Sequence, residues 1–120
     1  MGWQTHCQTK IMGHVAVLEQ AVMAVLEGYL SGPLYHRAAR SAQRLPALTE
    51  MLGWREETRV AQAMVPLFHP AAAFGLVQAL HLSELLAALY RAMASTAAGQ
   101  PPPREWDAAE RNAPALPPAA

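Results

Sequence analysis

The chain has 120 residues, the usual size of one domain with one hydrophobic core, and its nine basic residues balance nine acidic ones. Hydrophobic residues make up 52% of it and aromatic residues only 7%. Alanine and leucine, which are strong helix formers, supply most of this excess, so we expect an all-helical fold. Charged residues make up 15%, against about 25% in a typical domain, which argues against nucleic-acid binding through a basic surface.

The single cysteine, Cys7, excludes an internal disulfide framework and a Cys-rich metal site. We expect Cys7 to be a bystander near the terminus. The first ten residues lack the basic start and apolar stretch of a secretory signal. No stretch of about 18 apolar residues is free of Glu, Arg, Gln, His or Gly, as a membrane span would require. We therefore expect a soluble, cytoplasmic domain with neither a membrane nor a nucleic acid as partner.

The first predicted helix covers residues 10–30. Its apolar residues alternate spacings of four and three, which places them on one face of a helix that must be buried. These residues are Ile11, Val15, Leu18, Val22, Val25 and Tyr29. We expect Gly32 to end this helix near its C-cap and Pro33 to occupy the first turn of the next.

The second predicted helix covers residues 34–52 and ends at Gly53. Its expected inner face consists of Ala38, Ala42, Leu45, Leu48 and Leu52. Pro46 lies inside it, and a proline there typically costs about 3 kcal/mol or more. We therefore expect a kink, or two short helices that meet near Arg44.

The third predicted helix covers residues 55–68, with Glu56 and Glu57 in its first turn, where carboxylates favour the helix dipole. Its expected inner face is Val60, Met64 and Leu67, and Pro66 and Pro70 distort its end. The fourth covers residues 71–97, with Ser83 as a possible internal start. Its expected inner face is Leu82, Leu85, Leu86, Leu89 and Met93.

Six of the ten prolines lie from residue 99 onward, without apolar periodicity. The sequence thus divides into a helical domain, 1–98, and a Pro-rich C-terminal tail, 99–120, which composition predicts to be extended or disordered. Trp106 either packs back on the domain or serves as a docking residue. Four amphipathic helices with short connections predict an all-α fold, an antiparallel four-helix bundle.

Catalytic and metal-binding patterns are missing from the sequence. The five histidines, His6, His14, His36, His69 and His81, have no metal-ligand spacing, and we expect structural or surface roles for them. The sequence has no Gly-rich phosphate loop and no nucleophile with a credible base nearby. We expect no enzymatic activity, no metal and no cofactor.

The stretch 42–54, AQRLPALTEMLGW, resembles the second-helix motif of histidine-containing phosphotransfer (HPt) domains, approximately A-H-x-L-x-G-S-x-G-x-x-G-F/L. Ala42, Leu45, Gly53 and Trp54 fall on matching positions without a gap. Residues 56–61 look like the opening of that family's third helix, 15–21 like its first and 85–89 like its fourth. The resemblance covers roughly residues 11 to 96 and implies an HPt-like bundle.

The departures from this motif fall on the family's phosphorylation site. Gln43 stands where the family has its phosphorylatable histidine, and a carboxamide lacks the nucleophilic ring nitrogen. The family's glycine one turn later falls on Ala47, its serine on Leu48 and its middle glycine on Glu50. Pro46 would also deform the site. The resemblance thus implies a degenerate member that has lost phosphotransfer. His36, two turns before Gln43, is a less favoured substitute because nothing around it matches the family's site.

Three arginines surround the degenerate position Gln43: Arg37, Arg40 and Arg44. Together with Ala47 and Glu50 they form a possible partner-docking face, which would meet the acidic pocket of a receiver domain. The alternative is that these arginines only form a solvent-exposed helix face without a partner. The resemblance implies a bacterial protein-interaction module in two-component phosphorelay signalling, with a response-regulator receiver domain or a histidine kinase as partner. A helical oligomerisation or scaffold module, for example a homodimer, is the alternative function.

Overall fold

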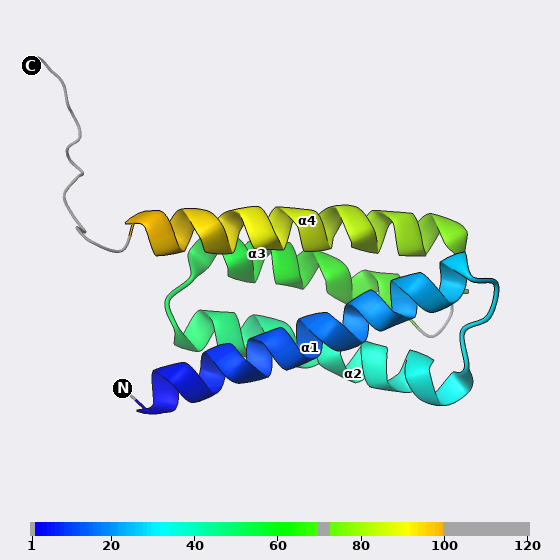
Figure 1. The fold of residues 1–120 in the computed structure, drawn as a ribbon, viewed down its shortest axis with the longest axis horizontal. Helices are drawn as coiled ribbons and strands as arrows, with labels where there is room; N and C mark the ends of the chain where they lie inside the picture. Colours follow the sequence, from blue (N-terminus) through cyan, green and yellow to red (C-terminus); the bar gives the residue numbers. More distant parts are fainter. Residues whose placement is uncertain (1, 70–72, 100–120) are drawn as a thin grey trace, which may run out of the picture. The chain divides into compact units, whose positions relative to one another are not determined.

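The computed structural model describes residues 2–69 and 73–99, and the prediction of an all-helical fold is confirmed for them (Figure 1). The elements are α1 (Gly2–Leu26), α2 (Gly32–Met51), α3 (Arg55–Met64), the 3-10 helix η1 (Val65–Phe68) and α4 (Leu76–Gly99). The tail 100–120, including Trp106, lies outside the described residues, so its predicted character stays a prediction.

The chain separates into two compact units, Met1–Tyr90 and Arg91–Ala120. The first contains α1, α2, α3, η1 and α4 as far as Tyr90. The described part of the second consists of the last turns of α4, Arg91–Gly99.

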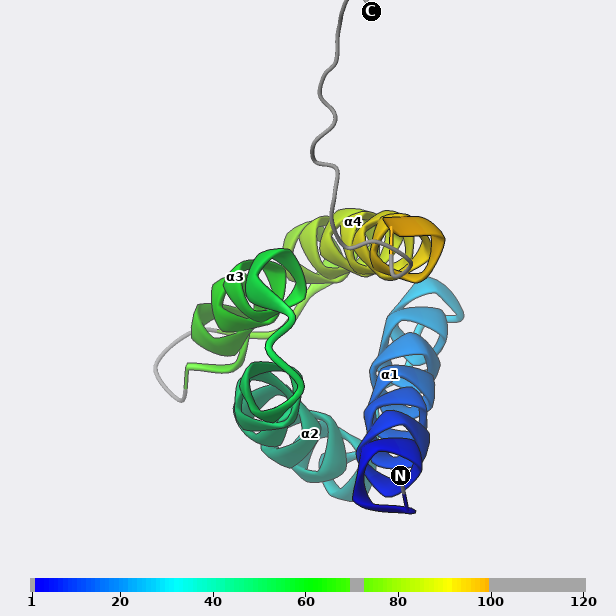
Figure 2. The same cartoon turned by 90° about the vertical axis from the view of Figure 1, so that its left-hand side faces the viewer.

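Within the first unit, successive helices run in opposite directions (Figure 1), and Figure 2 shows them end-on around a common centre. The most extensive contacts are between α1 and α2 and between α2 and α3. The Tyr90 hydroxyl donates a hydrogen bond of 2.8 Å to Glu19 Oε2 and so links α4 to α1. Every helix contributes to the apolar core, whose largest fully buried apolar members are Ile11, Val15, Leu18, Leu45, Met64, Leu82 and Leu89.

Two glycines end helices by the same backbone motif. Gly28 after α1 has φ of 100° and Gly53 after α2 has φ of 74°. At the second, the Trp54 N–H donates to the Thr49 carbonyl and the Gly53 N–H to the Glu50 carbonyl, both at 3.0 Å, which is the Schellman pattern. The predicted stop at Gly53 is confirmed.

The predicted end of the first helix was wrong, because Gly28 ends it four residues before Gly32. Tyr29 therefore lies outside α1 and is 76% exposed. Ser31 caps the next helix by accepting a hydrogen bond of 3.2 Å from the Leu34 N–H, and Pro33 lies in the first turn as predicted.

The N-terminal part of α1 also differs from the prediction, since the helix begins at Gly2 and not at Lys10. Cys7 is only 5% exposed. It lies four residues before Ile11, one turn earlier on the buried stripe. Cys7 is therefore a core residue, and its predicted role as a bystander was wrong.

Helix α2 continues through Pro46, which excludes the predicted division into two short helices. Buried residues lie on both sides of the proline: Ala38, Ser41, Ala42, Leu45 and Thr49. A proline inside a helix, which loses one backbone hydrogen bond and clashes with the carbonyl four residues earlier, costs about 3 kcal/mol or more, whereas burying one leucine gains about 1.5–3 kcal/mol. Burial on both sides therefore offsets the cost of the proline. Leu48 and Leu52, predicted on the inner face, are only half-buried.

The third and fourth helices are shorter at one end than predicted. The segment 65–68, which contains Pro66, is a 3-10 helix, as expected of a distorted end, and Phe68 is buried there. Glu57 in the first turn of α3 is buried at 1% exposure, while Glu56 is exposed and paired with Arg59. Helix α4 starts at Leu76 and passes through Ser83 without a break. Val60, Leu67, Leu85 and Met93 are half-buried.

Helix α1 is long and apolar enough to cross a membrane, by length and composition alone. The core helix of a soluble protein and an N-terminal signal sequence pass the same test. Of its most apolar 18-residue window, 28% is buried inside the structure.

Leu45 provides a test of the core around Pro46. Leu45→Ala should lower the free energy of unfolding by about 2–5 kcal/mol, because Leu45 is fully buried and its truncation leaves a cavity. Leu80→Ala, at a residue that is 50% exposed, should change it by less than about 0.5 kcal/mol. Urea denaturation followed by circular dichroism measures both. Equal effects of the two variants would contradict the core assignment.

Candidate functional site

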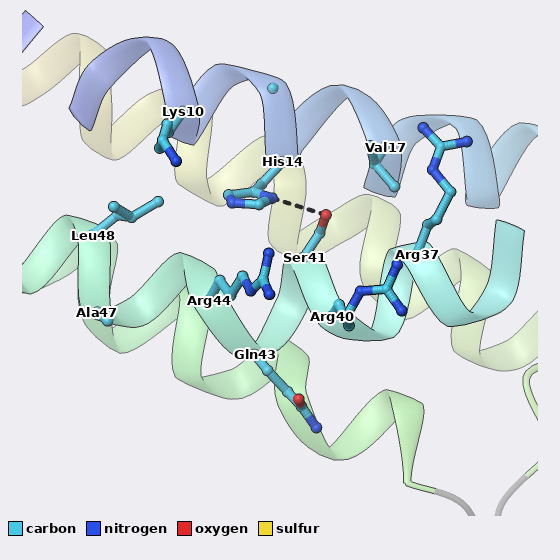
Figure 3. A pocket seen from close by; sticks show the side chains of 11 residues that line it. Lys10, His14, Val17, Arg37, Arg40, Ser41, Gln43, Arg44, Ala47 and Leu48 are labelled. Atoms are coloured by element: carbon cyan, nitrogen blue, oxygen red, sulfur yellow. Dashed lines mark hydrogen bonds between the residues drawn. The ribbon is translucent and has the colours of Figure 1, made fainter. Parts of the chain in front are cut away.

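A hollow with a volume of about 750 Å³ lies between α1 and α2 (Figure 3). We call it the α1–α2 groove. Helix α1 contributes Lys10, Gly13, His14 and Val17 to its lining, and α2 contributes Arg37, Arg40, Ser41, Gln43, Arg44, Ala47 and Leu48.

The groove is strongly cationic although the whole chain is neutral. Of the residues that the structure describes, four of the nine Lys and Arg residues in the sequence line it and no Asp or Glu does. Within the described part of the chain, none of these four cations forms an ion pair with a carboxylate. Carboxylates of the described residues therefore do not neutralise these positive charges, and the groove attracts anions.

A hydrogen bond between the two helices lies in the groove. His14 Nδ1 and Ser41 Oγ are 2.9 Å apart (Figure 3), and Ser41 is only 4% exposed. Because the neutral imidazole has one donor and one acceptor nitrogen, either partner can donate, depending on the tautomer. The bond fixes the ring of His14 against α2.

The pKa of His14 is lowered from its ordinary value of 6.5. Partial burial is the largest cause, followed by the positive charges of Arg44 and Lys10. Figure 3 shows the Arg44 side chain extending from α2 toward His14 and Ser41. The positive potential of the groove thus reaches the imidazole and favours its neutral form.

Five of the six residues predicted for the site are brought together in the groove. Arg37, Arg40, Gln43, Arg44 and Ala47 all line it. Figure 3 shows Gln43 extending away from His14, so its carboxamide is not directed at the imidazole.

The sixth predicted residue, Glu50, belongs elsewhere. It lines a separate hollow of about 300 Å³ at the turn from α2 to α3, together with Trp54 and Arg55. At this turn the Thr49 and Thr58 hydroxyl oxygens are 2.7 Å apart, and the Thr58 hydroxyl donates to the Trp54 carbonyl at 2.7 Å. Glu50 follows Ala47 by three residues on α2. It therefore lies beyond the end of the groove, next to the start of α3.

Sequence reasoning missed the two polar residues that α1 contributes, Lys10 and His14. It also missed Ser41, the partner of His14 on α2. The spacing of four between Lys10 and His14 does place them on one helix face. Nothing in the local pattern indicates that this face meets the arginines, because the pairing joins residues 27 apart in sequence.

The other histidines stay outside this arrangement. His36 is exposed, and its ring lies edge-on to Tyr35 with centroids 5.5 Å apart. Among the described residues, no three His, Cys, Asp or Glu side chains form a group that could hold a metal ion.

Comparison with known proteins adds no relative, since no family model, curated protein or solved structure matches this chain.

The lowered pKa of His14 predicts a pH dependence of stability. The unfolded chain binds this proton more readily than the folded one, so protonation favours unfolding. The stabilising contribution of neutral His14 should be complete above pH 6.5 and decline as the pH falls from 6.5 to the lower folded-state pKa. Urea unfolding at a series of pH values should show a smaller decline for His14→Gln.

His81→Gln, at an exposed histidine of α4, controls for the loss of an imidazole. This control should retain the decline of the parent protein. A decline that is unchanged by His14→Gln would contradict the assignment to His14.

Proposed function

We propose that this chain is a non-catalytic HPt-like four-helix bundle that acts in the bacterial cytoplasm as a protein-binding module of phosphorelay signalling. Its partner is a receiver domain, and the α1–α2 groove docks on that domain's acidic pocket. The observation that carries the proposal is the cationic groove, which includes Gln43 and the three predicted arginines.

The position of Gln43 supports binding without phosphoryl transfer. In the resemblance on residues 42–54, Gln43 stands where the phosphoryl acceptor would be. Its carboxamide offers no ring nitrogen to attack an acyl phosphate. A module with this substitution can occupy a receiver domain without discharging it.

The charge of the groove suits an acidic partner. Arg37, Arg40 and Arg44 are exposed, and a guanidinium can form two parallel hydrogen bonds with one carboxylate. Opposite charges across an interface raise the association rate and are screened by salt. Binding to a receiver domain should therefore weaken as ionic strength increases.

A double charge reversal tests this docking. Purified receiver domains of the source organism are titrated onto the immobilised full chain, with and without Arg40→Glu/Arg44→Glu. The reversal should weaken binding of a cognate receiver by about tenfold or more, because two attractions become repulsions. Arg55→Glu/Arg91→Glu, at exposed residues outside the groove, makes the same change in net charge and should bind like the parent.

The same receivers, charged with acetyl phosphate, test the absence of phosphotransfer. The chain should gain no acid-labile phosphate. Acid-labile phosphate on the chain would overturn the non-catalytic assignment, and binding that is equally weakened by both double variants would overturn the groove as the docking site.

A second candidate function is self-assembly, favoured by an apolar surface at the start of α4. Leu76, Val77 and Leu80 lie on its first two turns and are at least half exposed. Exposed apolar surface of this kind is typical of protein–protein contacts. If the chain is an oligomerisation module, light scattering should show a dimer that Val77→Glu/Leu80→Glu converts to monomer. A monomer at all concentrations would exclude this function.

A further inference from the structure

We propose that the α1–α2 groove also binds a small organic phosphate monoester, with the phosphate held by Lys10, His14 and Arg44 and the organic group lying along the groove. This inference uses the same groove as the proposed function but does not depend on it. It concerns the isolated protein and a small molecule, and no receiver domain takes part.

The charge distribution is the first argument. Among the described residues every Asp and Glu lies outside the lining of the groove, while Lys10, Arg37, Arg40 and Arg44 line it. Like charges that converge without a carboxylate repel one another. A dianion relieves this repulsion, whereas a neutral ligand does not.

The donor geometry is the second argument. Lys10 comes from α1 and Arg44 from α2, and both act electrostatically on His14, which lies between the helices. Arginine offers a planar fork that matches two phosphate oxygens, and lysine adds a point charge. The hydrogen bond between His14 Nδ1 and Ser41 Oγ holds the ring in place and does not use Nε2, which can bind a ligand.

The size of the groove and its apolar lining are the third argument. A volume of about 750 Å³ lies within the range of roughly 300–1,000 Å³ that is usual for small-molecule sites. Val17, Ala47 and Leu48 add apolar surface beside the cations. Gly13 leaves its part of the groove open, because a Cβ built there would meet no atom within 4 Å. These features favour a phosphate that carries an organic group over free phosphate.

Phenyl phosphate and inorganic phosphate are the probes. Each is titrated into the isotope-labelled full-length protein at constant ionic strength, and the NMR signals of the His14 ring are followed. We expect saturable shifts, tighter binding of phenyl phosphate than of inorganic phosphate, and a rise in the pKa of His14 when the anion is bound. Equal affinity for the two probes would overturn the assignment to a monoester.

Sulfate tests the role of His14, because the charge of the sulfate ion does not change between about pH 7.5 and about pH 5.5, so a pH dependence of its binding must come from the protein. Lys10, Arg37, Arg40 and Arg44 are the charged side chains that line the groove with His14. Sulfate affinity should therefore rise as the pH falls from about 7.5 to about 5.5 and His14 gains its proton. In His14→Gln this rise should vanish. A rise that persists in this variant would overturn the role of His14.

Three variants locate the ligand. Lys10→Gln and Arg44→Gln should each weaken phenyl phosphate binding by about tenfold, the usual effect of removing one charge-assisted hydrogen bond. Arg55→Gln, at an exposed residue outside the groove, is the matched control and should leave the affinity unchanged. Equal weakening by all three, or shifts at His14 no larger than at exposed His81, would overturn the site.

Gly13→Leu tests the groove without changing a charge. The substitution replaces a glycine inside a helix, so the variant should be at least as stable as the parent. Its side chain should occupy the open space and weaken phenyl phosphate binding. Unchanged affinity in this folded variant would overturn the placement of the organic group, and poly-glutamate that binds more tightly than phenyl phosphate would assign the groove to acidic protein segments alone.

Discussion

The close packing of α1 on α2 is the interaction on which the rest of this structure depends. Three of the four side chains that α2 buries before Pro46 are small, namely Ala38, Ser41 and Ala42, and the fourth is Leu45. Small side chains at a contact allow two helices to approach closely. The same approach brings His14 Nδ1 within 2.9 Å of Ser41 Oγ, so the packing that forms the core also forms the floor of the groove.

This packing concentrates positive charge on one surface of a chain whose net charge is zero. Each helix carries only a few charged residues, and a neutral total conceals where they lie. Packing α1 on α2 adds Lys10 to three arginines, while Glu50 and the carboxylates of α3 lie beyond the groove. The same packing lowers the pKa of His14, because partial burial and then the positive charges of Arg44 and Lys10 oppose its protonation.

Burial in the tertiary structure also decides whether a glycine or proline in the sequence ends a helix. At Gly53 the glycine and the Schellman hydrogen bonds act in the same direction, and the helix ends as predicted. At Pro46 the helix is not divided, because buried residues precede and follow the proline on one stripe. At Gly28 a glycine ends the helix although apolar periodicity continues to Tyr29, which by itself predicts a longer helix.

The sequence by itself determined the helical class, the four helices, Pro33 in a first turn, Gly53 at a helix end and the central part of each buried stripe. These properties are local, because propensity, capping and a period of 3.6 residues act within one or two turns. It also indicated the three arginines around Gln43, which share one segment of helix. Only the tertiary structure decided that Lys10 and His14 join them, that Ser41 is their partner and that Glu50 does not belong with them. The physical reason is that the alignment of one helix against the next is set by how their side chains pack, and residues far apart in the sequence meet only once that packing exists.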